Sequence, residues 1–291
     1  MRLCRFDDGL LGLVNDQVVY DVTAALDSLP SYRWQYPMGD ALIAHLPAVC
    51  SAAQRLKGHA RKFDLAQVQL RSPVANPGKI MAAPANYRLH VEIDAKDPAV
   101  HHNFHNKQLA GLDRPVETLG LFLKATSSVA GPSPGISLNW CDKRNDYEAE
   151  LVVVIGKTGK NISARDAMEY IAGYCMGLDM SVRGSEERSF RKSADSYTVL
   201  GPWLTTADEV ADPEQLMLWL TLNGAPRQRS STAAMTVGIR RLIEIASSAY
   251  TLYPGDILMT GTPEGVGAVV PGDVIVTGCE TLGEMTVPVG S

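Results

Sequence analysis

The sequence has few cysteines, and none of them form a paired motif. Its five cysteines among 291 residues are Cys4, Cys50, Cys141, Cys175 and Cys279. An odd number of scattered cysteines, with no CxxC pair, argues against a disulfide framework and against a zinc knuckle. We therefore expect reduced thiols and a cytoplasmic location.

The sequence also lacks long apolar runs and runs of basic residues. No apolar run approaches the length of a membrane span. Asp7 and Asp8 precede any long apolar stretch at the N-terminus, which argues against a signal peptide. The 32 acidic residues outnumber the 27 basic ones, for a net charge of −5. We therefore expect a soluble protein that binds neither membranes nor nucleic acid.

The length and composition of the chain suit one large domain and a smaller one. Hydrophobic residues make up 45% and charged residues 20% of a chain long enough to bury a large core. Short apolar runs with turn pairs predict a small antiparallel sheet over residues 1–22, and helical spacing of apolar residues follows over 38–62. The proline-containing segment 72–78 is the candidate linker. We therefore place a small N-terminal α/β module at 1–72 and the main domain at 73–291.

Turn signals are frequent in the main domain. The pair Asn223-Gly224 predicts a hairpin, and two PGD turns, at 254–256 and 271–273, each precede an aliphatic strand. Apolar residues on a single helical face indicate one helix over 239–250. Strands and helices do not alternate strictly, as they would in a doubly wound sheet. The sequence predicts an α+β fold that is mostly β.

An acidic pattern opens the most apolar strand of the chain. The stretch 146–156 reads DYEAELVVVIG, and its aliphatic core predicts a strand buried on both faces. Side chains alternate along a strand, so Glu148 and Glu150 point the same way, and Asp179 lies on a second apolar stretch. Three carboxylates that converge at a half-buried position favour a divalent cation such as Mg²⁺, Mn²⁺ or Ca²⁺ over Zn²⁺ or Cu²⁺. On spacing alone, the two glutamates also fit the solvated end of an ordinary strand.

Five motifs occur in an order that is typical of one family. They are DYEAELVVVIGK, YIAGYCMGLDMSVRG, RKSADSYTVLGPWL, the Asn-Gly hairpin and LYPGDILMTGTPEGVG. Over roughly residues 79–289, the chain thereby resembles the fumarylacetoacetate hydrolase family. The resemblance implies a β-roll-like catalytic domain, a homodimer, and Mg²⁺ or Mn²⁺ bound by Glu148, Glu150 and Asp179. It also implies a small anionic substrate that is a 2-oxo acid or a 1,3-dicarbonyl compound.

The resemblance also assigns the basic residues of the site. A divalent cation on three carboxylates leaves a formal charge of −1, so an anionic substrate needs further cations. Arg183 and Lys192 match the family's basic positions: Arg suits a bidentate contact with a carboxylate, and Lys places a point charge at an enolate oxygen. Thr262 matches a position that contacts substrate, and we add Lys124 and Tyr87 to the substrate-binding residues. Lys192 counts as catalytic as well.

A water-activating base is expected in the polar segment 88–118, which we interpret as a lid, a binding loop or a disordered insertion. His90, in NYRLH, matches the family's NYxxH motif, and a histidine titrates near neutrality. Members with a His–Glu dyad carry Glu three residues after the His, where this chain has Ile93; Glu92 lies one residue short. Where Gln is common in the family, this chain has Glu186. We keep Glu92 as a candidate catalytic partner of His90. The sequence does not identify which residue orients the His90 ring.

Together these residues predict a divalent-metal-dependent hydrolase that cleaves a C–C bond in a 1,3-dicarbonyl or acylpyruvate-type 2-oxo acid. Catabolism of aromatic or sugar acids is the expected context. The same metal site also suits a decarboxylase or an isomerase/hydratase of 2-oxo diacids, and decarboxylation needs no activated water. A non-catalytic binding protein of the same fold is a third interpretation, against which the intact carboxylate set and Lys192 argue.

Overall fold

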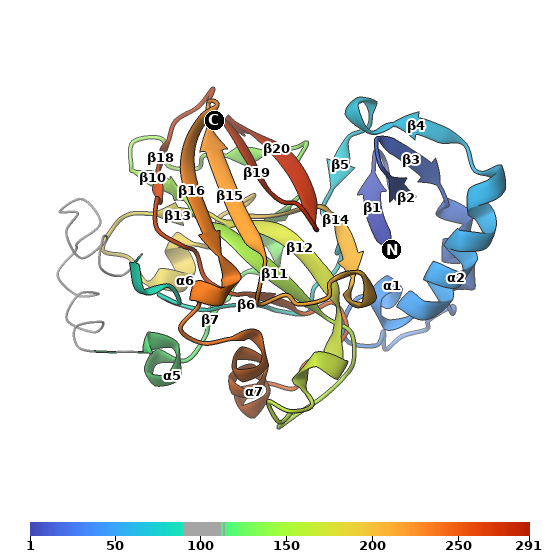
Figure 1. Cartoon of the computed structure of the whole chain (residues 1–291), viewed down its shortest axis with the longest axis horizontal. Coiled ribbons are helices and arrows are strands. Elements are labelled where there is room, and N and C mark those ends of the chain that lie inside the picture. The colour runs from blue at the N-terminus through green and yellow to red at the C-terminus, as the bar shows by residue number, and fades with distance from the viewer. Residues whose placement is uncertain (90–111, 113) are drawn as a thin grey trace.

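The computed structural model describes residues 1–89, 112 and 114–291 of the chain. Strands form the centre of the molecule, and short helices lie at its periphery (Figure 1). The predicted α+β, mostly β fold is therefore confirmed. None of the described helices has the length and apolar character needed to span a bilayer.

The largest sheet has 12 strands and contains both the N-terminal strands and the central strands of the main domain. Its main path, in spatial order, is β4 (Lys62–Asp64), β3 (Val18–Asp21), β2 (Leu10–Asn15), β1 (Arg2–Phe6), β14 (Thr198–Thr206), β12 (Ile171–Asp179), β11 (Ala149–Ile155), β17 (Ile257–Met259), β6 (Ile80–Ala82) and β7 (Phe122–Lys124). Beside this path, β5 (Leu70–Arg71) pairs with β1 and β8 (Val129–Ala130) pairs with β14. Because β1 pairs directly with β14, the N-terminal module and the main domain share one sheet. The boundary at residue 73 stays a prediction.

This sheet curls until its distant strands meet. Three strands separate β12 from β7 in the sheet order. Four strand spacings amount to about 19 Å in a flat sheet, which is far beyond the reach of a side chain. Lys124 at the end of β7 nevertheless donates a hydrogen bond to Asp179 at the end of β12. The contact shows the β-roll-like curvature that was expected.

Two smaller sheets complete the main domain. The first has three strands, β13 (Ser181–Val182), β10 (Asn145–Tyr147) and β18 (Gly267–Val269). The second has five strands, β16 (Ala225–Ser231), β15 (Met217–Leu222), β19 (Val274–Cys279), β20 (Gly283–Gly290) and β9 (Ile136–Ser137). The predicted Asn-Gly hairpin joins β15 to β16, and the two PGD turns precede β17 and β19, so these predictions are confirmed.

Short helices lie around the sheets. Among the described residues, the α-helices are α1 (Ala41–Ala44), α2 (Leu46–Leu56), α5 (Pro115–Leu119), α6 (Arg188–Arg191) and α7 (Ile239–Ala249). The 3-10 helices are η1 (Thr23–Ser28), η2 (Lys57–His59), η3 (Leu65–Gln67), η4 (Thr126–Ser128), η5 (Ala167–Tyr170), η6 (Ala207–Glu209) and η7 (Thr232–Ala234). The helix predicted over 239–250 is confirmed. The helical segment predicted over 38–62 is divided at His45, because Pro47 lies in the first turn of α2 and cannot continue a preceding helix.

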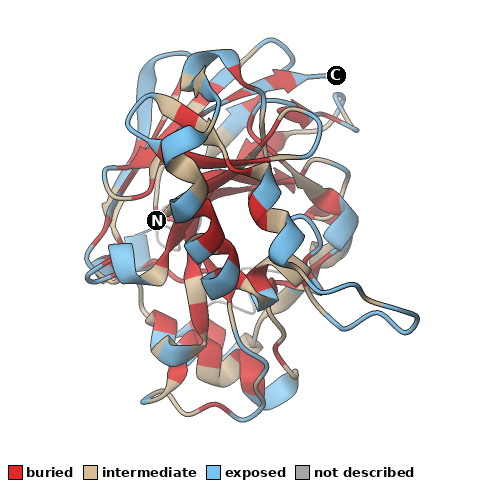
Figure 2. Ribbon diagram, turned by 90° about the vertical axis from the view of Figure 1, so that its right-hand side faces the viewer, coloured by how far each residue is buried: buried red, intermediate tan, exposed pale blue. Residues whose placement is uncertain are grey.

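The core lies on both faces of β11, as its aliphatic run predicts. Leu151 and Val153 pack in the cluster that includes the five-stranded sheet, whereas Val152 and Val154 pack in the cluster that includes α2. Figure 2 shows this buried interior in red between the exposed loops. A strand held on both sides gives a rigid base for the polar residues at its beginning.

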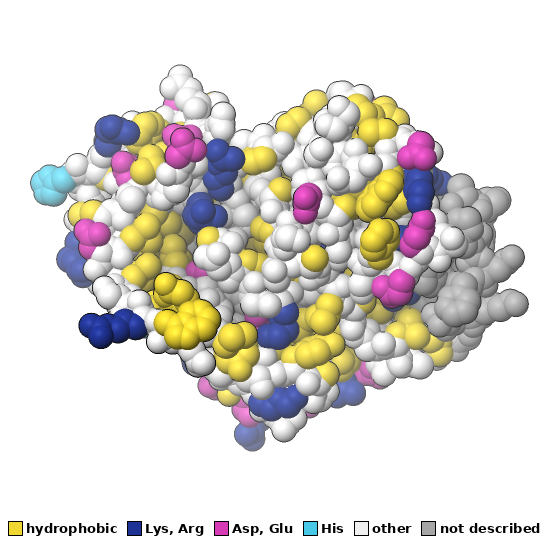
Figure 3. Space-filling view, turned by 180° about the vertical axis from the view of Figure 1, so that it is seen from behind, with side chains coloured by type: hydrophobic (Ala, Val, Ile, Leu, Met, Phe, Trp, Pro, Cys, Tyr) yellow, Lys and Arg dark blue, Asp and Glu magenta, His cyan; other side chains and the backbone are white. Residues whose placement is uncertain are grey.

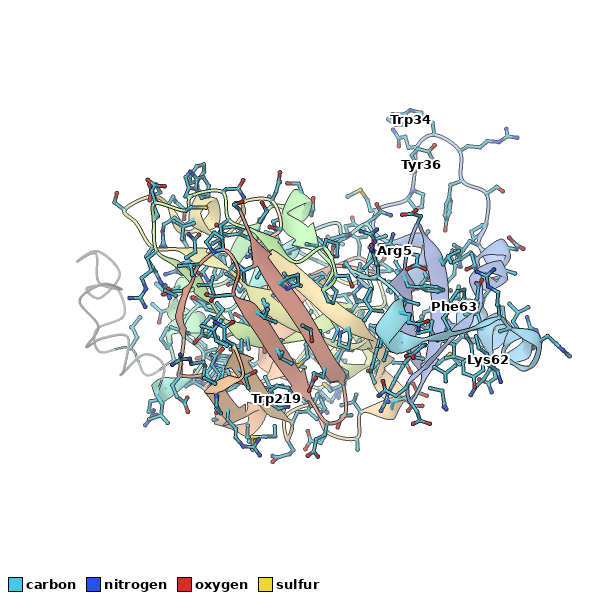
Figure 4. The ribbon with its side chains drawn as sticks, turned by 90° about the horizontal axis from the view of Figure 1, so that it is seen from above. Arg5, Trp34, Tyr36, Lys62, Phe63 and Trp219 are labelled. Atoms are coloured by element: carbon cyan, nitrogen blue, oxygen red, sulfur yellow. The ribbon has the colours of Figure 1, made fainter. Side chains whose placement is uncertain are left out.

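The surface of the molecule mixes charges of both signs. On the face shown in Figure 3, positive and negative side chains are interspersed among apolar ones. Figure 4 shows Trp34 and Tyr36 on a loop that projects from the N-terminal module, and both rings are exposed.

Candidate metal centre and active site

The pairing of β11 with β12 brings the three predicted carboxylates together. Glu148 immediately precedes β11, and its carbonyl oxygen accepts a hydrogen bond of 2.9 Å from the amide of Asp179 at the end of β12. Glu150 lies opposite Gly177 in the same pair of strands. A Cβ on that glycine would meet Val152 Cγ2 at 2.5 Å, so the position excludes a side chain. The glycine therefore lets Val152 and Met259 pack directly against β12.

These acids form a buried, all-oxygen cluster. Glu148, Glu150 and Asp179 each offer one carboxylate oxygen, and the three oxygens lie within 4.8 Å of one another. Their residues are 6%, 1% and 1% exposed. Hard divalent cations prefer such ligands, so the donor set fits the Mg²⁺, Mn²⁺ or Ca²⁺ expected from the sequence. The convergence predicted from strand alternation is confirmed.

The pKa of Glu150 is strongly perturbed. Burial raises its pKa well above the ordinary value, and the charges of Asp179 and Glu148 raise it further. The amide of Gly261 donates a hydrogen bond of 2.7 Å to Glu150 Oε2 and opposes this shift. The arrangement is unfavourable for three ionised acids alone, and a divalent cation would relieve it.

Two buried lysines contact the cluster, Lys124 from the end of β7 and Lys192 from the end of α6. Lys192 Nζ donates to Glu148 Oε2 at 2.8 Å and to Asp179 Oδ2 at 2.7 Å. Lys124 Nζ donates to Asp179 Oδ1 and, at 3.0 Å, to the carbonyl of Tyr197. Both lysines were predicted to bind substrate, and the structure places both against the acids that are predicted to hold the metal.

The two lysines differ in their electrostatic balance. Burial lowers the pKa of both ammonium groups. For Lys192, the charges of Asp179 and Glu148 outweigh burial, and its pKa is raised. For Lys124, burial and the neighbouring Lys192 outweigh Asp179, and its pKa is lowered. Lys192 therefore keeps its positive charge to a higher pH than Lys124 does.

Arg183 is held in place by a residue that the sequence reasoning did not select. Its Nε donates to Asp146 Oδ2 at 2.7 Å, and its Nη2 donates to Glu148 Oε1 at 3.3 Å. Arg144 Nε donates to the other Asp146 oxygen at 2.8 Å. Asp146 is fully buried and lies two residues before Glu148. Its place in the alternation DYEAE was the signal that could have revealed it.

Thr262 and Tyr87 lie at the side of the cluster nearest Glu150. The hydroxyl of Thr262 donates to the carbonyl of Ala149 at 2.9 Å and accepts from Gln228 Nε2 at 2.9 Å. The hydroxyl of Tyr87 is buried and has no hydrogen-bond partner among the described residues. Burial raises the pKa of Tyr87, and the charge of Glu150 adds to the shift. A substrate role for both residues stays a prediction.

The predicted base and its neighbours give a mixed outcome. His90 and Glu92 lie outside the described residues, so their predicted roles are untested. Glu186 accepts a hydrogen bond from Lys143, and this contact lowers the pKa of its carboxyl group. The position at which Gln is common in the family thus carries a paired charge in this chain.

Comparisons with known proteins agree with this geometry. Residues 79–290 match the family model described as fumarylacetoacetate (FAA) hydrolase C-terminal. The whole chain is 49% identical over 291 residues to maleylpyruvate hydrolase of Aquipseudomonas alcaligenes, covering 100% of both proteins. A crystal structure of maleylpyruvate hydrolase from Sphingobium sp. SYK-6, in complex with manganese(II) and pyruvate, superposes with a TM-score of 0.81 at 36% identity. That alignment covers 100% of this chain and 99% of the other.

A more distant structure belongs to an isomerase. The 5-carboxymethyl-2-hydroxymuconate delta-isomerase from Mycobacterium smegmatis is 29% identical, with a TM-score of 0.71, and the match covers 100% of this chain and 99% of that one. The matched motifs, the carboxylate cluster and the full-length similarity all lead to one assignment. The chain belongs to the fumarylacetoacetate hydrolase family.

Proposed function

We propose that this protein is a divalent-metal-dependent hydrolase that cleaves a C–C bond in an acylpyruvate, with maleylpyruvate as the favoured substrate. One observation carries the proposal. Glu148, Glu150 and Asp179 place three oxygens within 4.8 Å, with Lys124 and Lys192 against them. This combination holds a hard cation and an anionic 2-oxo acid at the same point.

The comparisons favour hydrolysis over the alternatives. The 49% identical relative is a maleylpyruvate hydrolase, whereas the isomerase structure is only 29% identical. Hydrolysis of maleylpyruvate between its methylene carbon and its distal keto carbon yields maleate and pyruvate. The neighbouring hydrolase structure contains pyruvate, which is a product of the proposed reaction, and manganese(II), which is one of the proposed metals.

Mg²⁺ or Mn²⁺ is the proposed cofactor, and Ca²⁺ also suits the ligand set. Glu148, Glu150 and Asp179 would hold it. When bound, the cation supplies Lewis acidity to a chelated 2-oxo acid and neutralises charge on the departing enolate. Lys124 contacts one oxygen of Asp179, and Lys192 contacts the other.

The remaining steps use side chains of this chain. Lys192 would place its ammonium group beside the enolate oxygen, because it contacts Glu148 and Asp179, two of the acids proposed to hold the metal. Arg183, oriented by Asp146, would contact the carboxylate of the pyruvyl group. His90 would take a proton from the attacking water, with Glu92 as its candidate partner.

Two further proposals concern the assembly and its location. We propose a homodimer in the cytoplasm, as implied by the family resemblance and by unpaired cysteines. Light scattering of the purified protein should give about twice the chain mass of 31.4 kDa.

The function is tested with purified protein and maleylpyruvate in Mg²⁺ or Mn²⁺. We expect loss of the enol absorbance and stoichiometric maleate and pyruvate. Dialysis against a chelator should abolish turnover, and either metal should restore it. Full turnover after such dialysis would contradict the proposal. Oxaloacetate decarboxylation faster than maleylpyruvate hydrolysis would favour the decarboxylase alternative.

Replacement of the predicted base separates these activities further. His90→Ala should lower C–C hydrolysis by about 10²–10⁴-fold, because general-base catalysis contributes in that range. Any decarboxylation should suffer much less, since it needs no activated water. Glu92→Gln should match His90→Ala only if the two residues form a dyad. Equal hydrolysis by parent and His90→Ala proteins would remove His90 from the mechanism.

A further inference from the structure

Ala149 lies between two acids of the cluster, Glu148 and Glu150, and is fully buried. In an extended strand, the N–H and C=O of one residue point to the same side of the strand. The carbonyl of Glu148 points toward β12, where it accepts from the amide of Asp179. The N–H and C=O of Ala149 point the other way, where the paired residues of β11 and β17 begin only at Val152. These two buried backbone groups therefore need partners from outside the sheet.

Two buried side chains supply these partners. Gln228 Oε1 accepts a hydrogen bond of 3.0 Å from the amide of Ala149. The hydroxyl of Thr262 donates to the carbonyl of Ala149 at 2.9 Å and accepts from Gln228 Nε2 at 2.9 Å. The three residues close a ring of hydrogen bonds, which we call the Ala149 clamp. Gln228 and Thr262 are only 2% and 3% exposed, so water competes little for these bonds.

The amide group of Gln228 is fully used by contacts within the chain. A glutamine amide offers two N–H donors and one acceptor oxygen. The oxygen is bonded to Ala149, and Nε2 donates to the hydroxyl of Thr262 and, at 2.9 Å, to the carbonyl of Pro263. These contacts fix the orientation of the amide. They also join β16 to the start of β11 and to the turn that follows β17.

The local structure of β16 directs Gln228 inward. The other residues of this strand are exposed or half-buried. β16 carries one residue more than β15 between two paired positions, so Arg227 is the extra residue of a β-bulge. Bulges change the direction of neighbouring side chains. Gly265, with φ of +96°, packs against this bulge, since a Cβ there would meet the Arg227 carbonyl oxygen at 2.0 Å.

The turn after β17 also contacts the cluster directly. The amide of Gly261 donates to Glu150 Oε2 at 2.7 Å, and Thr262 of the clamp is the next residue. On the other side of the strand, the amide of Asp179 holds the carbonyl of Glu148. The backbone between the two glutamates is thus held from both sides by contacts that lie outside the carboxylate cluster.

We infer that Gln228 and Thr262 are positioning residues of the metal centre. By fixing Ala149 they fix the spacing of the Glu148 and Glu150 carboxylates, and this spacing sets the affinity of the site and its preference among divalent cations. The inference rests on the metal site of the proposed function and names the residues that hold its ligands in place. Mg²⁺ requires near-ideal octahedral geometry, whereas Ca²⁺ accepts a more flexible one. A rigid backbone between two ligands therefore favours Mg²⁺ over Ca²⁺.

The test replaces Gln228 by methionine, which has a similar length but no amide group. Mn²⁺ affinity measured by calorimetry should fall about 10- to 100-fold, as is typical when a residue that orients metal ligands is lost. Competition experiments should show a larger loss of affinity for Mg²⁺ than for Ca²⁺. The electron paramagnetic resonance spectrum of bound Mn²⁺ should broaden, because the ligand geometry becomes less uniform. Thr262→Val removes the other side chain of the clamp and should have the same effects, so it tests the inference even if Gln228→Met does not fold.

Thr232→Val is the matched control. Thr232 is 1% exposed, and its hydroxyl accepts from the amide of Leu216 and donates to the carbonyl of Pro213, both at 2.9 Å. This variant also loses buried hydrogen bonds, but outside the site. Its melting temperature should fall, whereas its Mn²⁺ affinity and spectrum should match those of the parent.

Melting of the metal-free proteins shows which variants are folded, and the metal measurements then decide between the possible results. Parent-like Mn²⁺ affinity in a folded clamp variant would overturn the positioning role and leave the proposed hydrolase intact. Equal losses for Mg²⁺ and Ca²⁺ would show that the clamp does not set the preference between them. A parent protein that binds no Mn²⁺ would overturn the proposed metal centre, and this inference with it.

Discussion

Among the described residues, buried carboxylates occur in two regions, and the surroundings of these carboxylates differ. At the junction of the N-terminal module with the main domain, Asp40 is 3% exposed. Its Oδ1 accepts from the amides of Leu42 and Ile43, at the start of α1, and its Oδ2 accepts from the amides of Ala75 and Asn76. Backbone amides surround this charge on both oxygens. Asp40 therefore ties the end of the linker to the first helix.

Asp256, in the first PGD turn, is likewise buried and likewise accepts hydrogen bonds from backbone amides. Its carboxylate accepts from the amides of Lys79 and Tyr253 and forms an ion pair with Lys79. Burial raises its pKa, whereas these neighbours lower it. At Glu150, the neighbouring Asp179 and Glu148 add to the effect of burial. Burial alone therefore does not distinguish the acids of the candidate metal site. Glu150 differs from Asp256 because other carboxylates lie beside it.

The largest effect is expected from removal of one acid of the metal cluster. Glu150→Gln should lower kcat/KM by at least about 1,000-fold, because a Lewis-acid metal contributes several kcal/mol to the transition state. Mn²⁺ affinity by calorimetry should fall in parallel. The metal-free variant should be at least as stable in urea as the parent, since a buried charge is lost. Retained metal binding and turnover would exclude Glu150 as a ligand.

The second largest effect is expected on kcat when Lys192 of the candidate site is replaced. Lys192→Met should lower kcat by about 100- to 1,000-fold, with little change in KM, because the enolate charge develops only in the transition state. Steady-state kinetics with maleylpyruvate measures this split. Lys160→Met is the control, because the ammonium group of Lys160 contacts an exposed backbone carbonyl outside the site. A change in KM alone would show that Lys192 binds substrate without stabilising the enolate.

At the junction, the same kind of substitution should act on stability instead. Asp40→Ala leaves four backbone amides without an acceptor and should reduce the free energy of unfolding by about 2–4 kcal/mol. The folded variant should keep its kcat at 25 °C. Urea unfolding and kinetics together test the contrast with Glu150→Gln. Loss of turnover in a folded Asp40→Ala protein would mean that the two regions are coupled.

The smallest effect concerns the pH dependence of the metal-free protein. The native pKa of Glu150 lies above its ordinary value, so the native state binds more protons than the unfolded state in the intervening pH range. Stability should therefore fall as pH rises from the ordinary glutamate range through the native pKa. Urea unfolding in chelator measures this slope, and Glu150→Gln should flatten it. An equal slope in parent and variant would assign the dependence to other groups.

Local patterns in the sequence were sufficient for much of the fold and for the metal ligands. The alternation in DYEAELVVVIG placed Glu148 and Glu150 on one side of a strand buried on both faces, and the structure confirms both features. Turn chemistry located the β15–β16 hairpin, and helical periodicity located α7. These features depend on residues close together in the chain, so their physical causes are visible in the sequence.

The partners of the carboxylates were decided by the tertiary structure. Lys124 lies 55 residues before Asp179 and reaches it only because the large sheet curls through three intervening strands. Arg183 meets Asp146 across 37 residues through the pairing of β10 with β13. Sheet curvature and the pairing of distant strands result from packing over the whole domain. No local pattern specifies them, and for that reason the sequence identified the charged residues of the site but not which of them are in contact.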